Sequence, residues 1–197
     1  MNAVNVVNTV NTVGTNLSRI ACVGLPGSGK STVGRQLARR LGFQFTDSDV
    51  VIEQRAGCSI REFFEREGEA AFRDLEQSVM DDLTREGCGV LSTGGGTVLR
   101  PQNRINLRSR AQVIYLHSAP EEVFRRLRND QNRPLLQVAD PLARLRELYA
   151  ERDPLYRETA HFVIETGRPS VATLVNMILM QLELASTVSP GSAVLPG

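Results

Sequence analysis

The chain has 197 residues, a length that suits one domain with a full hydrophobic core. Hydrophobic residues make up 41% of it, but no stretch approaches the roughly 18 consecutive apolar residues of a membrane-spanning helix, so we expect no membrane protein. The 23 basic and 22 acidic residues leave a net charge of +1, too little for a chain-wide positive field that would recruit nucleic acid or anionic lipid, so a small-molecule ligand is favoured.

The two ends of the chain differ in composition from the middle. Residues 1–18 repeat Asn, Val and Thr without a charged side chain, and residues 186–197 are rich in Pro, Gly and Ser. Such segments bury too little apolar surface to become ordered, so we predict a disordered leader and a disordered tail. The sequence therefore predicts a single folded domain over residues 19–185.

Cysteine and lysine are both scarce. Cys22, Cys58 and Cys88 show no C-x-x-C spacing, so they predict neither a disulfide framework nor a zinc site, and they favour a reducing cytoplasm. Lys30 is the only lysine, although the chain has 22 arginines. A compact ammonium kept at one position predicts a task that the planar guanidinium of arginine cannot perform.

Short β-rich runs alternate with amphipathic stretches along the domain. The expected strands are residues 20–23, 43–46, 90–92, 113–117 and 162–164. The expected helices are residues 31–41, 69–85, 119–127, 141–156 and 170–184. Ser118 and Ser170 precede two of these helices as expected N-caps. This alternation predicts an α/β fold, a parallel sheet with helices on both faces.

A phosphate-binding motif follows the first expected strand. Residues 24–31 read GLPGSGKS and match G-x-x-x-x-G-K-[ST], at the start of an expected helix. Glycines let the backbone N–H groups turn inward, and the helix N-terminus adds partial positive charge. Lys30 can then reach the β- and γ-phosphates of a nucleotide, and the Ser31 hydroxyl can bind Mg²⁺. The alternative is a glycine-rich turn with an incidental lysine, which the absence of any other lysine makes less attractive. The predicted nucleotide contacts in this motif are Gly27, Ser28, Gly29, Lys30, Ser31 and Thr32.

Two large classes of nucleotide-binding protein fit the rest of the chain poorly. A switch GTPase needs a second lysine in N-K-x-D, and Lys30 is already used. A mechanical or transport ATPase normally has an apolar strand that ends in Asp-Glu, whereas the expected strand at residues 90–92 ends in serine. The carboxylate for the metal must therefore come from elsewhere.

The second expected strand leads into Asp47-Ser48-Asp49. Carboxylates at positions i and i+2 of an extended chain point the same way, so both can face the phosphate loop if the two strands are neighbours. Asp47 could then hold Mg²⁺ through a water molecule, and Asp49 could accept the proton of an acceptor hydroxyl. The alternative is that Asp49 caps a helix at residues 50–56.

Together with four later motifs, these residues resemble the shikimate kinases. The later motifs are SIREFFEREGEAAFRDLE at 59–76, STGGG at 92–96, RPLL at 133–136 and ERDPLYRETA at 151–160, so the resemblance covers about residues 20–184. It implies a three-layer α/β/α sandwich with a five-stranded parallel sheet, a substrate-binding region at 49–76 and a lid at 128–140. The implied activity is ATP-dependent phosphorylation of shikimate to shikimate 3-phosphate, on the way to chorismate and the aromatic amino acids. It implies Mg²⁺ as cofactor, and we expect a cytoplasmic monomer.

The resemblance also implies roles for single residues. Arg73 and Arg152 would bind the shikimate carboxylate, while Asp49 and the backbone of Gly94, Gly95 and Gly96 would hold ring hydroxyls. Arg133, on the lid, would close over the transferred phosphoryl group, and Arg168 lies in a segment similar to the adenine loop of the family. Arg126 and Arg128 remain alternatives for stacking on adenine.

Less specific explanations exist for these residues. Arg73 and Glu76 could be an exposed ion pair, the three glycines a tight turn and Arg133 a solvated loop residue. His117 and His161 suit packing better than catalysis, and Cys22 in an apolar strand should be inert.

Two rival functions remain open. A gluconate kinase would use the same phosphate loop, although the FRDLE and GGG motifs argue against it. A nucleotide-gated binding module without turnover is disfavoured by intact Lys30, Asp49 and Arg133.

Overall fold

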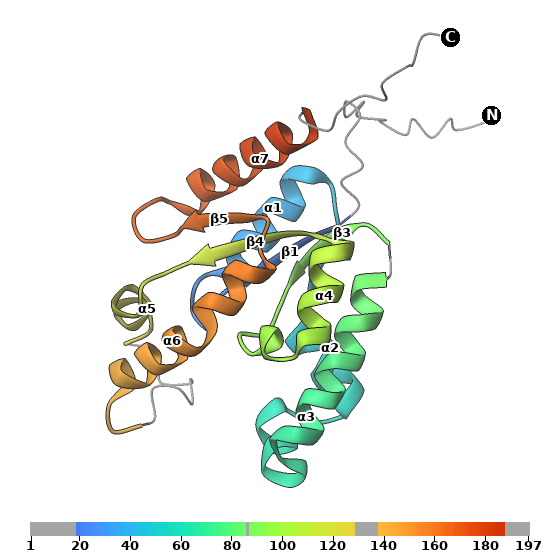
Figure 1. Cartoon of the computed structure of the whole chain (residues 1–197), viewed down its shortest axis with the longest axis vertical. Coiled ribbons are helices and arrows are strands. Elements are labelled where there is room, and N and C mark those ends of the chain that lie inside the picture. Colours follow the sequence, from blue (N-terminus) through green and yellow to red (C-terminus); the bar gives the residue numbers. More distant parts are fainter. Residues whose placement is uncertain (1–18, 86, 129–137, 188–197) are drawn as a thin grey trace, which may run out of the picture.

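The computed structural model describes residues 19–85, 87–128 and 138–187. Five parallel strands form one sheet in the order β2-β3-β1-β4-β5, with β1 at its centre (Figure 1). The strands are β1 (Arg19–Val23), β2 (Phe45–Asp47), β3 (Gly89–Ser92), β4 (Gln112–His117) and β5 (Phe162–Glu165). The predicted α/β class and five-stranded parallel sheet are confirmed.

Helices cover both faces of the sheet, as the alternating sequence predicts. Ile20 and Cys22 of β1 pack toward α1 (Lys30–Leu41) and α7 (Val171–Thr187). Ala21 and Val23, which point the opposite way, pack with side chains from the helices of the other face. Those helices are α3 (Ile60–Arg85), α4 (Pro101–Arg110), α5 (Pro120–Leu127) and α6 (Pro141–Thr159).

A smaller unit projects from one end of the sheet (Figure 1). It consists of α2 (Ser48–Ala56) and the part of α3 that packs against it, around a cluster of Ile52, Phe72 and Val79. Residues 49–76, the predicted substrate-binding region, lie in this unit. Helix α3 begins at Ile60 and not at residue 69, because it continues across a kink at Gly68, where φ is 80° and ψ is 176°.

The structure adds one helix that was not expected, contradicts one expected N-cap and confirms another. Helix α4 was not expected, and a short 3-10 turn, η1 (Thr97–Leu99), precedes it. Ser118 is not an N-cap: α5 is preceded by Ala119, and the buried Ser118 hydroxyl bonds to the Thr166 hydroxyl instead. Ser170 does cap α7, because its hydroxyl accepts from Thr173 N at 3.2 Å.

Some expectations lie outside the described residues. The leader predicted at 1–18, residues 188–197 of the tail predicted at 186–197, and residues 129–137 of the lid predicted at 128–140, including Arg133, belong to this group. The tail prediction is wrong at its start, because Ser186 and Thr187 continue α7. Among the described helices, none has both the length and the apolar character needed to cross a bilayer.

Because all five strands are parallel, their carboxyl ends meet at one edge of the sheet. β1 leads there into the phosphate loop, β2 into α2, and β3 into the three glycines. Ligands of open parallel sheets bind at this edge. The topology therefore brings together motifs that are far apart in the sequence.

Candidate active site

The loop between β1 and α1 adopts a conformation that needs glycine. Gly27 and Gly29 have φ values of 82° and 96°, in the region that side chains disfavour. A Cβ on Gly27 would also lie 2.6 Å from a methyl group of Leu127. Gly29 precedes α1 without a side-chain cap, so the first N–H groups of the helix remain available for phosphate oxygens.

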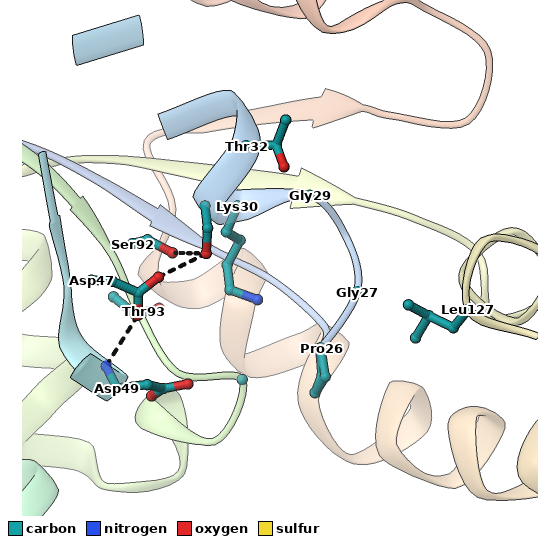
Figure 2. A pocket seen from close by; sticks show the side chains of 12 residues that line it. Pro26, Gly27, Gly29, Lys30, Thr32, Asp47, Asp49, Ser92, Thr93 and Leu127 are labelled. Carbon is teal, nitrogen blue, oxygen red and sulfur yellow. Dashed lines mark hydrogen bonds between the residues drawn. The ribbon is translucent and has the colours of Figure 1, made fainter. Parts of the chain in front are cut away.

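Lys30 extends from the first turn of α1 into this loop (Figure 2). It is 8% exposed, and its ammonium donates to the carbonyls of Gly24 at 2.8 Å and Leu25 at 2.9 Å. These bonds place a positive charge inside the loop that is expected to hold phosphates. The position agrees with the predicted role of the only lysine.

Ser31, in the first turn of α1, contacts the carboxyl ends of β2 and β3. Its hydroxyl donates to Asp47 Oδ2 at 2.7 Å and lies 3.2 Å from the Ser92 hydroxyl (Figure 2). A hydroxyl beside a carboxylate offers the hard oxygen donors that Mg²⁺ prefers, with room for water and nucleotide oxygens as further ligands. The residues present thus fit a magnesium ion of the kind that the sequence predicts at Ser31 and Asp47.

Asp49 lies in the first turn of α2, and its carboxylate points into the same space (Figure 2). The helix is capped by Asp47, whose Oδ1 accepts from Asp49 N at 3.1 Å, so the alternative of Asp49 as the cap is wrong. Burial, followed by the negative charges of Asp47, Glu76 and Glu53, raises the pKa of Asp49 to about 6, although Lys30 opposes the shift. A carboxylate with this pKa can accept a proton near neutral pH.

One cavity of about 320 Å³ joins these groups. It contains five of the six predicted nucleotide contacts, both aspartates and one of the three glycines. Its lining residues are Pro26, Gly27, Gly29, Lys30, Ser31, Thr32, Asp47, Asp49, Ser92, Thr93, Gly95 and Leu127. The sixth contact, Ser28, is buried, and its Oγ has no hydrogen-bond partner among the described residues.

Arg73 is not an exposed ion pair, because its side chain is 13% exposed and that of its partner Glu76 only 1%. Arg73 Nη1 donates to Glu76 Oε2 at 2.7 Å, and Glu76 Oε1 accepts from the Thr97 hydroxyl at 3.0 Å. A Cβ on Gly96 would lie 2.8 Å from Arg73 Cζ, so this glycine makes room for the guanidinium. Gly94 makes similar room for the carboxylate of Asp49.

Arg152 approaches the same glycines from α6. Its Nη1 donates to the Gly95 carbonyl at 3.2 Å, and the hydroxyl of Tyr156 donates to the same oxygen at 2.5 Å. The structure therefore gathers the predicted acceptor residues from α2, α3, α6 and the loop after β3 beside the phosphate loop.

The three described arginines predicted near adenine do not share one environment. Arg126 does not project freely for stacking, because its guanidinium donates to Thr166 O, in the loop after β5. Arg128 and Arg168 are exposed. Arg133 lies outside the described residues.

Sequence reasoning did not assign a role to Ser92, Thr93 or Tyr156. Ser92 and Thr93 line the cavity at the carboxyl end of β3, a position that the expected strand could have indicated. Tyr156 gave no such signal, because its contact depends on how α6 packs.

Comparison with known proteins agrees with this geometry. A family described as "Shikimate kinase" matches residues 26–183. The shikimate kinase of Paracidovorax citrulli is 64% identical over 174 residues, which cover 87% of this chain and 95% of that protein. A solved shikimate kinase from Acinetobacter baumannii, in complex with shikimate, has a TM-score of 0.82 at 45% identity and covers 88% of this chain and 97% of its own.

A gluconokinase from Sinorhizobium meliloti has a TM-score of 0.57 at 16% identity, over 87% of this chain and 94% of its own, which shows a shared fold alone. The family match and the identity to the Paracidovorax citrulli protein each extend over most of the described domain. The chain belongs to the shikimate kinase family.

Proposed function

We propose that this protein transfers the γ-phosphoryl group of ATP to a ring hydroxyl of shikimate, giving shikimate 3-phosphate and ADP. The observation that carries the proposal is the shared cavity, in which Asp49 faces the phosphate loop while two largely buried arginines, Arg73 and Arg152, and the three glycines lie beside it. Family membership adds the substrate class. The product serves the route to chorismate and the aromatic amino acids.

On the nucleotide side, the N–H groups of the loop and the first turn of α1 would hold the β- and γ-phosphates. Lys30 would exchange its two carbonyl partners for phosphate oxygens and so offset their charge. Ser31 directly, and Asp47 through water, would hold Mg²⁺, which when bound offsets charge on the phosphates. Arg133 would add a further positive charge from the lid, and Arg168 would contact the nucleotide from the loop after β5.

On the acceptor side, Arg73 and Arg152 would bind the shikimate carboxylate, for which a planar guanidinium is well matched. Glu76 fixes the direction of Arg73. Backbone groups of Gly94, Gly95 and Gly96 would approach the ring closely. These contacts would aim one ring hydroxyl at the γ-phosphorus.

Asp49 would act where the two halves meet. As the acceptor oxygen forms its bond to phosphorus, the bond between that phosphorus and the ADP oxygen breaks, and the hydroxyl proton passes to the Asp49 carboxylate. Positioning and charge stabilisation carry most of such a transfer. The raised pKa of Asp49 makes the carboxylate a better proton acceptor than an ordinary aspartate.

We also propose that the protein works in the reducing cytoplasm. Cys22, Cys58 and Cys88 are free thiols. Burial raises the pKa of Cys22 to about 12, which supports the expectation that this thiol is inert.

The decisive experiment is an acceptor panel assayed for ADP release. Shikimate should support turnover, whereas gluconate and water alone should give only background rates. Turnover with gluconate in place of shikimate would contradict the acceptor assignment. Nucleotide binding without ADP release on any acceptor would instead indicate a binding module.

A further inference from the structure

The inner face of α6 carries two pairs of polar side chains. Spacings of three, one and three residues place four side chains on one face of the helix: Tyr149, Arg152, Asp153 and Tyr156. Arg152 and Tyr156 both donate to the carbonyl of Gly95, at the acceptor side of the cavity. Whatever fixes the position of α6 therefore also fixes these two contacts.

The other pair on α6 contacts β4. The Tyr149 hydroxyl lies 2.9 Å from Nε2 of His117, and Asp153 Oδ1 accepts from the Tyr115 hydroxyl at 2.8 Å. Tyr115 and His117 are two residues apart on β4, so both point to the face of the sheet that α6 covers. We call Tyr115, His117, Tyr149 and Asp153 the β4–α6 polar cluster.

The cluster continues directly into the acceptor contacts. The rings of Tyr115 and Tyr156 lie with centroids 5.0 Å apart, and Tyr156 is fully buried. Arg157 supports the cluster from outside by donating to Asp153 Oδ2 at 2.9 Å. An unbroken series of contacts thus runs from His117 to the carbonyl of Gly95.

The two ring nitrogens of His117 contact different partners. Nδ1 lies 2.6 Å from Glu165 Oε2, but the Glu165 side chain is 69% exposed, so this contact contributes little. A neutral ring that donates from Nδ1 to Glu165 accepts the Tyr149 hydroxyl at Nε2. The His117 side chain is only 13% exposed, so the partly buried bond to α6 carries more weight than the bond to Glu165.

We propose that the β4–α6 polar cluster, through the bond between His117 Nε2 and the Tyr149 hydroxyl, is a positioning unit that holds Arg152 and the carbonyl of Gly95 in place for the acceptor. The proposal rests on the function proposed above and assigns His117, Tyr149 and Asp153 a part in it. These residues do not touch the cavity, so they act through Arg152 and Tyr156. Loss of the bond should weaken acceptor binding and leave nucleotide binding nearly unchanged.

A pair of amide substitutions at His117 separates the two ring nitrogens. The amide of glutamine reaches the place of Nε2, whereas the shorter asparagine reaches only the place of Nδ1. His117→Gln should therefore keep the shikimate KM within about twofold of wild type, and His117→Asn should raise it about fivefold or more. The KM for ATP should change less than about twofold in both variants.

Tyr149→Phe removes the same bond from the other side and should reproduce the effect of His117→Asn. The matched control is Thr159→Val, which deletes a buried hydroxyl of the same helix, bonded to Leu155 O at 2.7 Å within α6. It should lower the melting temperature without separating the two KM values. Its comparison with Tyr149→Phe shows whether destabilising α6 is enough to weaken acceptor binding.

The measurements are steady-state KM values for both substrates, the dissociation constant of shikimate by calorimetry and the melting temperature of each variant. Equal effects of glutamine and asparagine, a parallel rise in the KM for ATP, or an acceptor effect of the same size in Thr159→Val would overturn the proposal. Failure of the wild-type protein to phosphorylate shikimate would contradict the proposed function itself, and the two failures are therefore distinguishable.

Discussion

Lys30 illustrates what one side chain can be required to do. Its ammonium fits between two carbonyls of its own loop, and the buried position leaves little room for a wider group. We expect Lys30→Arg to turn over at less than about a tenth of the wild-type rate, a loss of at least about 1.4 kcal/mol in transition-state stabilisation. Lys30→Ala should lose turnover as well. ADP release measures both effects.

Circular dichroism and melting temperature serve as controls for the Lys30 variants, since both proteins should fold. An arginine variant that retains more than about a tenth of the rate would mean that a guanidinium can replace the ammonium, and that Lys30 does not have the proposed role.

Substitution of Asp49 should slow phosphoryl transfer without weakening nucleotide binding. We expect Asp49→Asn to bind ATP normally while kcat falls about 100-fold, the usual loss for a positioned base. In the wild type, kcat should fall as the pH drops through about 6, because protonation removes the acceptor of the hydroxyl proton. An unchanged kcat in the variant would show that the proton leaves by another route.

The ionised carboxylate of Asp49 should lower the stability of the folded protein in the same pH range in which it can accept a proton. Its pKa is higher in the folded protein than the ordinary value of 3.8, so the folded state binds the proton more tightly than the unfolded state does. The ionised group therefore destabilises the fold above pH 6, and this cost disappears as the pH falls toward 4. Asp49→Asn should melt higher than wild type at pH 8, by about 2–4 °C for each kcal/mol relieved, and the difference should vanish near pH 4. Thermal melts across this pH range measure it.

At the scale of elements, the loop after β3 can pack closely against helix α3 because Gly96 has no side chain. Gly96 has an ordinary backbone conformation, with φ of −99°, so alanine there adds no backbone strain. Its Cβ would displace the guanidinium of Arg73. We expect Gly96→Ala to raise the shikimate KM at least about tenfold with little change in the KM for ATP or in melting temperature.

Arg73→Lys provides the comparison for Gly96→Ala, because it weakens the same carboxylate contact without changing the loop. It should produce the same selective rise in shikimate KM. If either variant weakened ATP binding instead, the acceptor site would have to lie elsewhere.

Elements held by apolar periodicity were predictable, and those held by polar contacts were not. Four of the five strands were found because each contains a short apolar run. The fifth, β2, covers Phe45–Asp47 and not residues 43–46, because its short, half-buried sequence FTD carries little apolar signal. Helix α4 was missed because its burial depends on Asn103 and Asn106 as well as Leu107, and Asn106 bonds to Asp81 of α3. No apolar period reveals such a helix.

The residues of the candidate site also differ in how far the sequence could predict them. The phosphate loop and the two aspartates could be predicted because local spacing defines them. The Gly95 carbonyl contacts depend on the packing of α6 over β4, which follows from the tertiary structure alone.

At the scale of the whole molecule, the described elements account for the proposed catalytic unit except the lid. We expect removal of residues 1–16 and 188–197 together to leave turnover and melting temperature nearly unchanged, because neither segment has a core-forming pattern. The cut at 188 keeps α7 whole, since this helix ends at Thr187. A loss of several degrees on truncation would show that one segment docks on the domain.

The central position of β1 has a consequence for how the protein is made. Arg19 pairs with Gly89, and Ile20 pairs with Gln112, so the strand that leads into the phosphate loop finds its neighbours only after a long stretch of chain has been synthesised. Pairings this distant in sequence are slow to form because the intervening chain must first be closed into a loop. During translation, β1 and the nucleotide-binding loop that follows it therefore remain without their neighbouring strands until β3 and β4 leave the ribosome.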